Sequence, residues 1–114
     1  MPFLKLQTNV EISPDTQRTL METLSRETAS QLGKPERYVM VALEPARSML
    51  FAGSDAPLAY LELKSIGLPG DLTPALSGAL CKRVSETLDI PGDRIYIEFA
   101  DAPRTMWGWN GGTF

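Results

Sequence analysis

Residues 2–43 read PFLKLQTNVEISPDTQRTLMETLSRETASQLGKPERYVMVAL, and the hydrophobic pattern of this stretch decides the fold. In its first part, residues 2–8, the apolar Leu4 and Leu6 alternate with residues that face the other way, which is the period-two pattern of a strand with one buried face. In its last part, residues 38–43 are apolar at nearly every position, which predicts a strand that is covered on both faces. The stretch therefore begins and ends with a strand.

Between these strands the sequence predicts one amphipathic helix. Ser13 offers a capping hydroxyl, Pro14 fits the first turn, and Asp15 lies near the positive end of the helix dipole. Gly33 can end the helix in a left-handed conformation. The core-facing side chains recur every four residues: Leu20, Leu24, Thr28 and Leu32. Strand, helix and strand form a β-α-β unit, whose two strands are parallel and whose helix covers one face.

The second half of the chain repeats this order. Residues 58–67 alternate like residues 2–8, and Thr73-Pro74 predicts another capped helix start. Pro91 then leads into an apolar strand over residues 94–99, as Pro35 does in the first half. The stripe of this second helix consists of Leu76, Leu80, Val84 and Leu88. We predict an α/β (α+β) fold with two β-α-β units, a four-stranded mixed sheet and both helices on one face, as a single domain over residues 1–114.

Such a sheet leaves its other face bare. In a chain of 114 residues, the most plausible cover for that face and for the apolar strand is another copy of the same chain, so we expect a homo-oligomer. The tail over residues 106–112 is aromatic and rich in glycine, and we predict an ordered loop or short edge strand there.

Composition excludes several kinds of chemistry. The chain has no histidine, so it has no Ser-His-Asp or Cys-His nucleophile and no imidazole metal site. The single cysteine, Cys81, lies on an apolar helix stripe, cannot form an internal disulfide or a thiolate zinc cage, and is predicted to be an inert core thiol. We therefore predict no metal site. A general base acting near neutral pH would have to be a carboxylate, a lysine, a tyrosine or the amino terminus.

Charge and hydropathy narrow the partners and the location. The net charge is −3 and no basic cluster is present, which argues against nucleic acid or an anionic membrane. No apolar run approaches the roughly 20 residues of a membrane helix. No basic segment leads into an apolar core at the N-terminus, so we expect a cytoplasmic protein.

Pro2 is the most informative candidate for a base. Removal of Met1 would leave it as a free secondary amine, and an α-amino group has a reference pKa of roughly 7.7–8.0. Burial or a nearby cation would lower that value and give a general base close to neutral pH. The alternative is that proline is merely a common second residue. Lys34, at a fixed corner between Gly33 and Pro35, could bind a carboxylate, or it could be a solvated lysine at a helix end.

Other candidates have equally ordinary alternatives. Backbone N–H groups of Ser65 and Ile66 become free where their strand ends, which could serve a ligand or be an ordinary strand exit. The hydroxyl of Tyr96 could reach a ligand or belong to a core or interface. Four aromatic residues could wall a pocket or simply pack: Tyr38, Trp107, Trp109 and Phe114.

Six short blocks, taken in order, resemble the macrophage migration inhibitory factor (MIF) family of the tautomerase superfamily. They are Met1-Pro2, Thr8-Asn9-Val10, Gly33-Lys34-Pro35, Ser65-Ile66-Gly67, Asp93-Arg94-Ile95-Tyr96-Ile97, and Gly108-Trp109-Asn110 through Thr113-Phe114. Each block is weak alone, but all six lie in register along essentially the whole chain. The resemblance implies two β-α-β units assembled as a homotrimer, with sites at the subunit interfaces.

The resemblance also implies roles for individual residues. Pro2 would be the catalytic base, Lys34 would bind the substrate carboxylate, and the backbone N–H of Ile66, beside Ser65, would contact the ligand. Tyr96 would be contributed by a neighbouring subunit. The aromatic positions that match the family's pocket are Tyr38, Trp109 and Phe114. Because one amine can take and return a proton, no metal or organic cofactor is expected.

Three features depart from the family pattern. Leu58 and Leu61 replace the cysteines of the Cys-x-x-Cys motif of vertebrate members, which excludes the thiol-oxidoreductase activity proposed for that motif. Glu98 replaces a usual asparagine and adds a negative charge near the pocket. Trp107 replaces a small aliphatic residue, and would either narrow the pocket or offer a stacking surface.

The first functional hypothesis is an isomerase: a cofactor-free keto–enol tautomerase for small aromatic 2-keto acids of the phenylpyruvate and 4-hydroxyphenylpyruvate type. The second is a cytokine-like or host-interaction protein with a vestigial pocket; the sequence leaves a receptor partner and non-classical secretion open without supporting either. The third is a decarboxylase or dehalogenase using the same proline. That reaction usually needs arginines near the base, and only Arg37 and Arg94 lie beside a family block.

Overall fold

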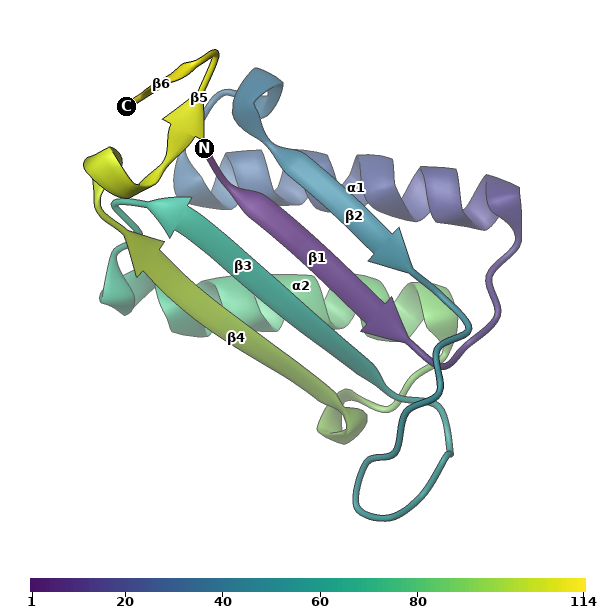
Figure 1. Ribbon diagram of the computed structural model, residues 1–114. Helices are drawn as coiled ribbons and strands as arrows, with labels where there is room; N and C mark the ends of the chain where they lie inside the picture. The colour runs from purple at the N-terminus through teal and green to yellow at the C-terminus, as the bar shows by residue number, and fades with distance from the viewer.

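The computed structural model describes all residues from Met1 to Phe114 (Figure 1). Four strands form the main sheet: β1 (Phe3–Thr8), β2 (Met40–Glu44), β3 (Ala59–Ile66) and β4 (Ile95–Ala102). The two helices are α1 (Pro14–Leu32) and α2 (Thr73–Leu88). Short 3-10 turns lie at η1 (Glu36–Tyr38), η2 (Gly70–Leu72), η3 (Gly92–Arg94) and η4 (Arg104–Met106), and the tail forms a hairpin of β5 (Gly108–Trp109) and β6 (Gly112–Thr113).

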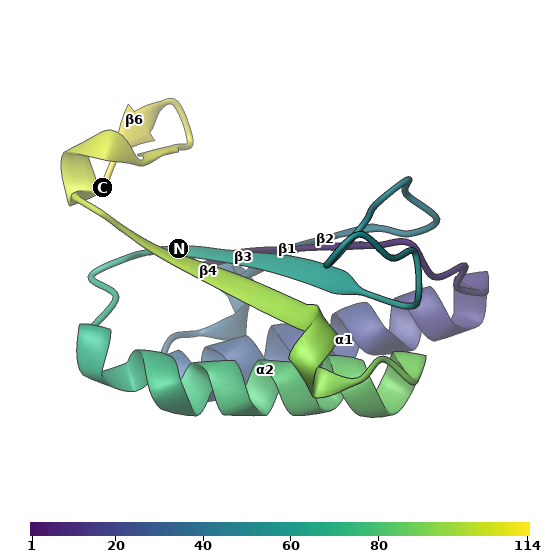
Figure 2. The same cartoon turned by 90° about the horizontal axis from the view of Figure 1, so that it is seen from below.

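The main sheet is mixed, as predicted. Its strand order is β2-β1-β3-β4, with parallel pairing in the two outer pairs and antiparallel pairing between β1 and β3 in the centre. Both helices lie on the same face of this sheet (Figure 2). The two β-α-β units thus meet along β1 and β3, and the fold class expected from the sequence is confirmed.

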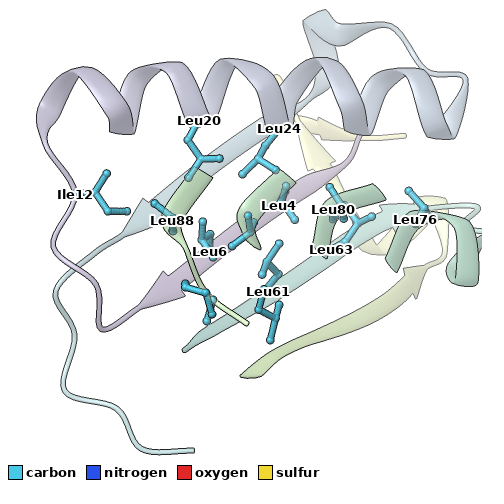
Figure 3. Packing of buried hydrophobic residues seen from close by; sticks show 14 of the residues in the cluster. Leu4, Leu6, Ile12, Leu20, Leu24, Leu61, Leu63, Leu76, Leu80 and Leu88 are labelled. Atoms are coloured by element: carbon cyan, nitrogen blue, oxygen red, sulfur yellow. The ribbon is translucent and has the colours of Figure 1, made fainter. Parts of the chain in front are cut away.

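The hydrophobic core lies between the sheet and the two helices (Figure 3). Leu4 and Leu6 of β1 and Leu61 and Leu63 of β3 are fully buried. The helices contribute the predicted stripes, which include Leu20, Leu24, Leu76, Leu80, Val84 and Leu88. Each such side chain stabilises the fold by roughly 1.5–3 kcal/mol when it leaves water, so the leucine pattern is the main determinant of this layer.

The helix starts differ from one another. The hydroxyl of Ser13 accepts a hydrogen bond from the backbone N–H of Thr16 at 3.3 Å, so α1 begins as predicted. The prediction that Thr73 caps α2 is wrong: Leu72 occupies the capping position, and the Thr73 hydroxyl donates to the carbonyl of Gly70 at 2.9 Å. The reason is that the turn η2 runs directly into α2 and already fills the position before the helix.

The two units share their backbone details. Gly33 ends α1 and Asp89 ends α2, both in the left-handed conformation with φ of 63° and 56°. Pro35 and Pro91 then precede the turns η1 and η3, which lead into the outer strands β2 and β4. The repeat of strand, helix, proline-led turn and strand that the sequence suggested is therefore present in the structure.

Two expectations are wrong: where the strand β2 begins and how deeply Cys81 is buried. The strand expected over residues 38–43 is β2, which begins only at Met40 because the preceding residues form η1. Met40 is 65% exposed and no residue of β2 is fully buried, since β2 is an edge strand that one chain covers only on its helix side. Cys81 is half-buried at the margin of the core, where its thiol faces the carbonyl of Gly92 at 3.9 Å.

The uncovered face of the sheet carries charged and polar groups. Lys5 forms an ion pair with Glu62 at 3.2 Å, and the Tyr60 hydroxyl lies within hydrogen-bond distance of Glu62 and Glu98. The hydrogen bond to Glu98 and then burial raise the pKa of Tyr60. Lys5 and then Tyr60 lower the pKa of Glu62. Neither helix is both long and apolar enough to cross a membrane.

Candidate active site

The sheet topology gathers the predicted site residues at one edge. Because β1 runs antiparallel to β3, and β3 runs parallel to β4, the start of β1 lies beside the ends of β3 and β4. The register shows this directly: Phe3 pairs with Lys64, and Ile66 pairs with Ala102. The N-terminus and the β5–β6 hairpin lie at this edge (Figure 1). A terminal amine, a strand end and the aromatic tail therefore come together.

Lys34 reaches this edge from the end of α1. The backbone N–H groups of Gly33 and Lys34 bond to the carbonyls of Ser30 and Ala29 at 3.3 and 3.0 Å, which fixes the corner. The Lys34 ammonium donates to the hydroxyl of Ser65 at 2.9 Å and to the carbonyl of Ile66. Lys34 is thus held against the end of β3 and is not the solvated lysine of the alternative interpretation.

Two cavities open at this edge, and Met1 lines both. The first has a volume of about 570 Å³ and is lined in part by Lys34, Ile66 and Arg104. The second has a volume of about 460 Å³ and is mainly apolar, with Pro2, Tyr38, Trp107, Trp109 and Phe114 in its wall. Tyr38 belongs to both cavities. Met1 and Tyr38 are the two residues that line both cavities, so they lie between a cavity that contains Lys34 and an aromatic one.

The amino terminus lies in a desolvated, positive environment. Pro2 is buried, and its carbonyl accepts a hydrogen bond from the N–H of Met40 at 3.0 Å. Burial, and secondly the charge of Lys34, lower the pKa of the Met1 amine. Burial also lowers the pKa of Lys34, and the charge of Asp101 opposes that change. A free amine at this edge is therefore shifted toward its neutral, proton-accepting form.

The aromatic residues form one connected cluster. The rings of Trp109 and Phe114 stack with centroids 5.5 Å apart, and the ring of Tyr38 meets both edge-on at 6.2 and 6.4 Å. Tyr38 belongs to η1, whereas Trp109 belongs to the β5–β6 hairpin, which turns at Asn110 and Gly111, both with positive φ. Trp107 is tied to it by the hydrogen bond from the Phe114 N–H to its carbonyl at 3.2 Å. The cluster is an ordered wall, as the sequence predicted for the tail.

Tyr96 is the one predicted site residue that a single chain leaves apart. It is the second residue of β4 and pairs with Tyr60 of β3, about 13 Å along the strands from the Phe3–Lys64 pair. Its ring is 66% exposed and packs on Phe51 with a centroid distance of 4.7 Å. Within one chain Tyr96 lies at the opposite end of the strands from this site, so a role for it here requires a second chain.

Four charged residues line the two cavities without having been predicted as site residues: Asp101, Arg104, Lys64 and Arg37, the last named only as lying beside a family block. Asp101 and Arg104 line the first cavity, and Arg37 lines the second with its guanidinium 4.8 Å from the ring centre of Tyr38. The expected strand over residues 94–99 was too short, whereas β4 runs to Ala102 and ends beside β3. Because parallel strands end at the same edge, a longer strand prediction would have placed Asp101 and Arg104 beside Ser65 and Ile66.

Comparison with known proteins gives the family. The family model described as macrophage migration inhibitory factor (MIF) matches residues 1–114. The chain belongs to the MIF family. Among its relatives are a MIF homologue of Trichuris trichiura, 36% identical over 115 residues with complete coverage of both chains, and the MIF of Xenopus laevis, 35% identical over 117 residues with 100% of this chain and 99% of the relative covered.

The solved structures agree with this membership. The crystal structure of a MIF homologue from Prochlorococcus marinus is 43% identical, covers 98% of each chain and has a TM-score of 0.93. The MIF of Trichinella spiralis is 31% identical, with 98% of this chain and 99% of that chain covered and a TM-score of 0.91. The resemblance drawn from six short blocks is thus confirmed, and the fold is that of the tautomerase superfamily.

Proposed function

We propose that this MIF family member is a cofactor-free keto–enol tautomerase that acts on small aromatic 2-keto acids of the phenylpyruvate type. The observation that carries the proposal is the position of Pro2: it is buried at the wall of an aromatic cavity, one residue from a cavity that contains Lys34. The carboxylate of such an acid matches Lys34 in the first cavity, and its ring matches the aromatic wall of the second.

The proposed chemistry begins with the loss of Met1, which turns the Pro2 nitrogen from an amide into a secondary amine. The substrate carboxylate binds at Lys34, and the ring lies among Tyr38, Trp109 and Phe114. The neutral Pro2 amine accepts the proton of the enol hydroxyl, and the resulting ammonium delivers a proton to the adjacent carbon as the carbonyl forms. The reverse direction removes the carbon proton and protonates the oxygen, so the amine is regenerated in either direction.

The electrostatics support Pro2 as a base near neutral pH. Burial and Lys34 lower the pKa of the amine that now occupies the chain end, Met1. Pro2 is more deeply buried than Met1, so burial would lower the pKa of its freed amine as well. An enolate that develops during the transfer would be stabilised by the Lys34 charge and by the backbone at Ile66.

We further propose a cytoplasmic homotrimer in which Tyr96 of one subunit completes the site of the next. The support is indirect: a single chain keeps Tyr96 exposed at the opposite edge of the sheet, and one face of the sheet has no helix over it. Analytical ultracentrifugation tests the stoichiometry, and loss of activity in Tyr96→Phe at an unchanged sedimentation coefficient would support the shared site.

The decisive test of the tautomerase compares three proteins in the ultraviolet assay for enol-to-keto conversion of phenylpyruvate. Wild type with Met1 removed, as checked by intact mass, is expected to be active. Pro2→Gly keeps a free terminal amine but loses the proline ring. Insertion of one alanine between Met1 and Pro2 leaves the Pro2 nitrogen as an amide, and should abolish turnover.

Equal rates in wild type and the alanine insertion would contradict the proposal. A protein that lacks turnover in every form, yet provokes a receptor-dependent response in cells, would instead support the cytokine-like alternative. Circular dichroism on all three proteins ensures that a lost rate reflects lost chemistry and not lost folding.

A further inference from the structure

Arg104 shares the first cavity with Lys34 but has no partner of its own. It is the first residue of η4, directly after the end of β4, and its side chain is exposed at the cavity rim. None of the four ion pairs in the structure includes it, and its guanidinium makes no hydrogen bond within the chain. A guanidinium has five donors in a fixed fork, so its full binding capacity remains available to a ligand.

The backbone around Arg104 is well fixed. Pro103 sets the entry to η4, and the N–H of Met106 bonds to its carbonyl at 2.9 Å. The carbonyl of Arg104 in turn accepts from the N–H of Trp107 at 3.3 Å, and Trp107 lines the aromatic cavity. The turn therefore places a free cation and an aromatic wall three residues apart, on the two sides of the same site.

Lys34 alone cannot satisfy a carboxylate. Its ammonium has three N–H donors, and two already serve the Ser65 hydroxyl and the Ile66 carbonyl. One donor remains for a ligand, whereas the two oxygens of a carboxylate accept up to about four hydrogen bonds. A second cation at the same cavity supplies the donors that Lys34 lacks.

The charge balance of the cavity also favours an anion. Asp101 is the one acidic residue in the wall, and its carboxylate accepts the N–H of Leu68 at 3.0 Å. Against it stand Lys34 and Arg104, so the cavity is net positive in a chain whose net charge is −3. Arg37 and Lys64, which line the neighbouring cavity, add to this positive field. Such a local excess attracts and orients anionic ligands.

From these contacts we infer that Arg104 is a second carboxylate-binding residue, which holds the carboxylate of a 2-keto acid together with Lys34 and selects acids over their neutral esters. The inference rests on the proposed function for the identity of the acid. Arg104 approaches the carboxylate with its fork, and Lys34 adds its one free N–H. Arg104 therefore acts in binding and takes no part in the proton transfer.

The test compares Arg104→Ala and Arg104→Lys with wild type on phenylpyruvate and on its methyl ester. Arg26→Ala, on the exposed face of α1, is the matched control because it removes the same charge away from the cavity. We expect Arg104→Ala to raise the KM for the acid by about 10- to 100-fold, the loss of one charge-assisted pair, with kcat changed less than about threefold. The KM for the ester should change less than about threefold. Arg104→Lys should recover part of the loss, and more of it at low ionic strength.

Direct binding separates this inference from the tautomerase proposal. Quenching of tryptophan fluorescence, or calorimetry, gives a Kd for phenylpyruvate whether or not the acid turns over. A weaker Kd in Arg104→Ala but not in Arg26→Ala supports the inference even if no variant is a tautomerase. Equal Kd values in wild type and Arg104→Ala, equal losses for acid and ester, or no binding of phenylpyruvate to wild type would each overturn it.

Discussion

The ammonium of Lys34 donates a hydrogen bond of 2.9 Å to the hydroxyl of Ser65, a fully buried residue at the end of β3. This contact joins two residues that lie 31 positions apart and connects the corner after α1 to the centre of the sheet. It holds Lys34 where it is partly shielded from water, and burial lowers the pKa of Lys34 while the charge of Asp101 opposes the change. The charge state of Lys34 therefore depends on the balance between its burial and the negative charge of Asp101.

Asp101→Asn should shift the pH dependence of the proposed activity. The asparagine oxygen can still accept the N–H of Leu68, but the negative charge that raises the pKa of Lys34 is gone. Lys34 then loses its proton at a lower pH, so the alkaline limb of kcat/KM moves to lower pH. Profiles for Asp101→Asn and for the exposed Asp93→Asn, as a control, check this. An unchanged limb would mean that the Lys34 charge does not control substrate binding.

Arg94→Ala should loosen the loop between β2 and β3. The guanidinium donates to the backbone carbonyls of four loop residues: Phe51 at 3.2 Å, Ser54 at 3.0 Å, Ala56 at 2.9 Å and Pro57 at 3.0 Å. Loss of these four hydrogen bonds should lower the free energy of unfolding by about 1–3 kcal/mol and speed amide hydrogen exchange over residues 51–58. Hydrogen exchange detected by mass spectrometry measures the effect. Arg83→Ala, which removes a more exposed contact, should leave exchange in the loop unchanged.

Leu80→Ala should destabilise the core of the protein. Leu80 is fully buried where α2 packs against the sheet, so its removal leaves a cavity in addition to the lost apolar burial. We expect the free energy of unfolding in urea to fall by about 2–5 kcal/mol. Leu50 is 70% exposed, and Leu50→Ala should change the same quantity by no more than about 0.5 kcal/mol. Similar losses in both variants would contradict the burial shown in Figure 3.

Glu62→Gln should remove part of the acid sensitivity of the fold. Lys5 and Tyr60 lower the pKa of Glu62 below its ordinary value of 4.5, so the ionised form stabilises the folded state. This contribution is complete above pH 4.5 and is lost as the pH falls through the folded pKa.

The stability difference between wild type and Glu62→Gln should therefore be largest near neutral pH and shrink in acid. Urea titrations at a series of pH values measure it. Glu22→Gln, which breaks an exposed helical ion pair with Arg18, should show little difference at any pH. A wild-type advantage over Glu62→Gln that persists at low pH would show that charge is not its source.

The fold could be predicted because its determinants are local. The leucines four residues apart in α1 and α2 and the alternation in β1 and β3 are properties of short windows, and they lead to the β-α-β units directly. The Thr73 cap could not be predicted, because η2 extends the helix backward and this depends on the backbone before it. One chain leaves one face of β2 open, which agrees with the expectation that another copy would cover it. The start of β2 at Met40 escaped prediction because the turn η1 takes up the residues before it.

The candidate site was only partly predictable from the sequence. Pro2, Lys34 and Ser65 belong to recognisable blocks, and the structure brings these residues to one edge of the sheet. Asp101 and Arg104 belong to no block, and they enter the cavity only because β4 runs three residues beyond its expected end. Charged residues at strand ends acquire their meaning from topology, which short motifs do not contain.

The internal repeat of the fold has a consequence for how catalysis could arise in it. Each β-α-β unit offers the same corner after its helix, but the position that Lys34 fills in the first unit is filled by Ile90 in the second, and Ile90 is buried. The strand of the second unit starts inside the chain, after Leu58, where no free amine exists. A polypeptide has a single amino terminus, so only one of the two equivalent strand starts can ever provide a proline base. The corner of the other unit has no such base to serve and is free to evolve as hydrophobic packing.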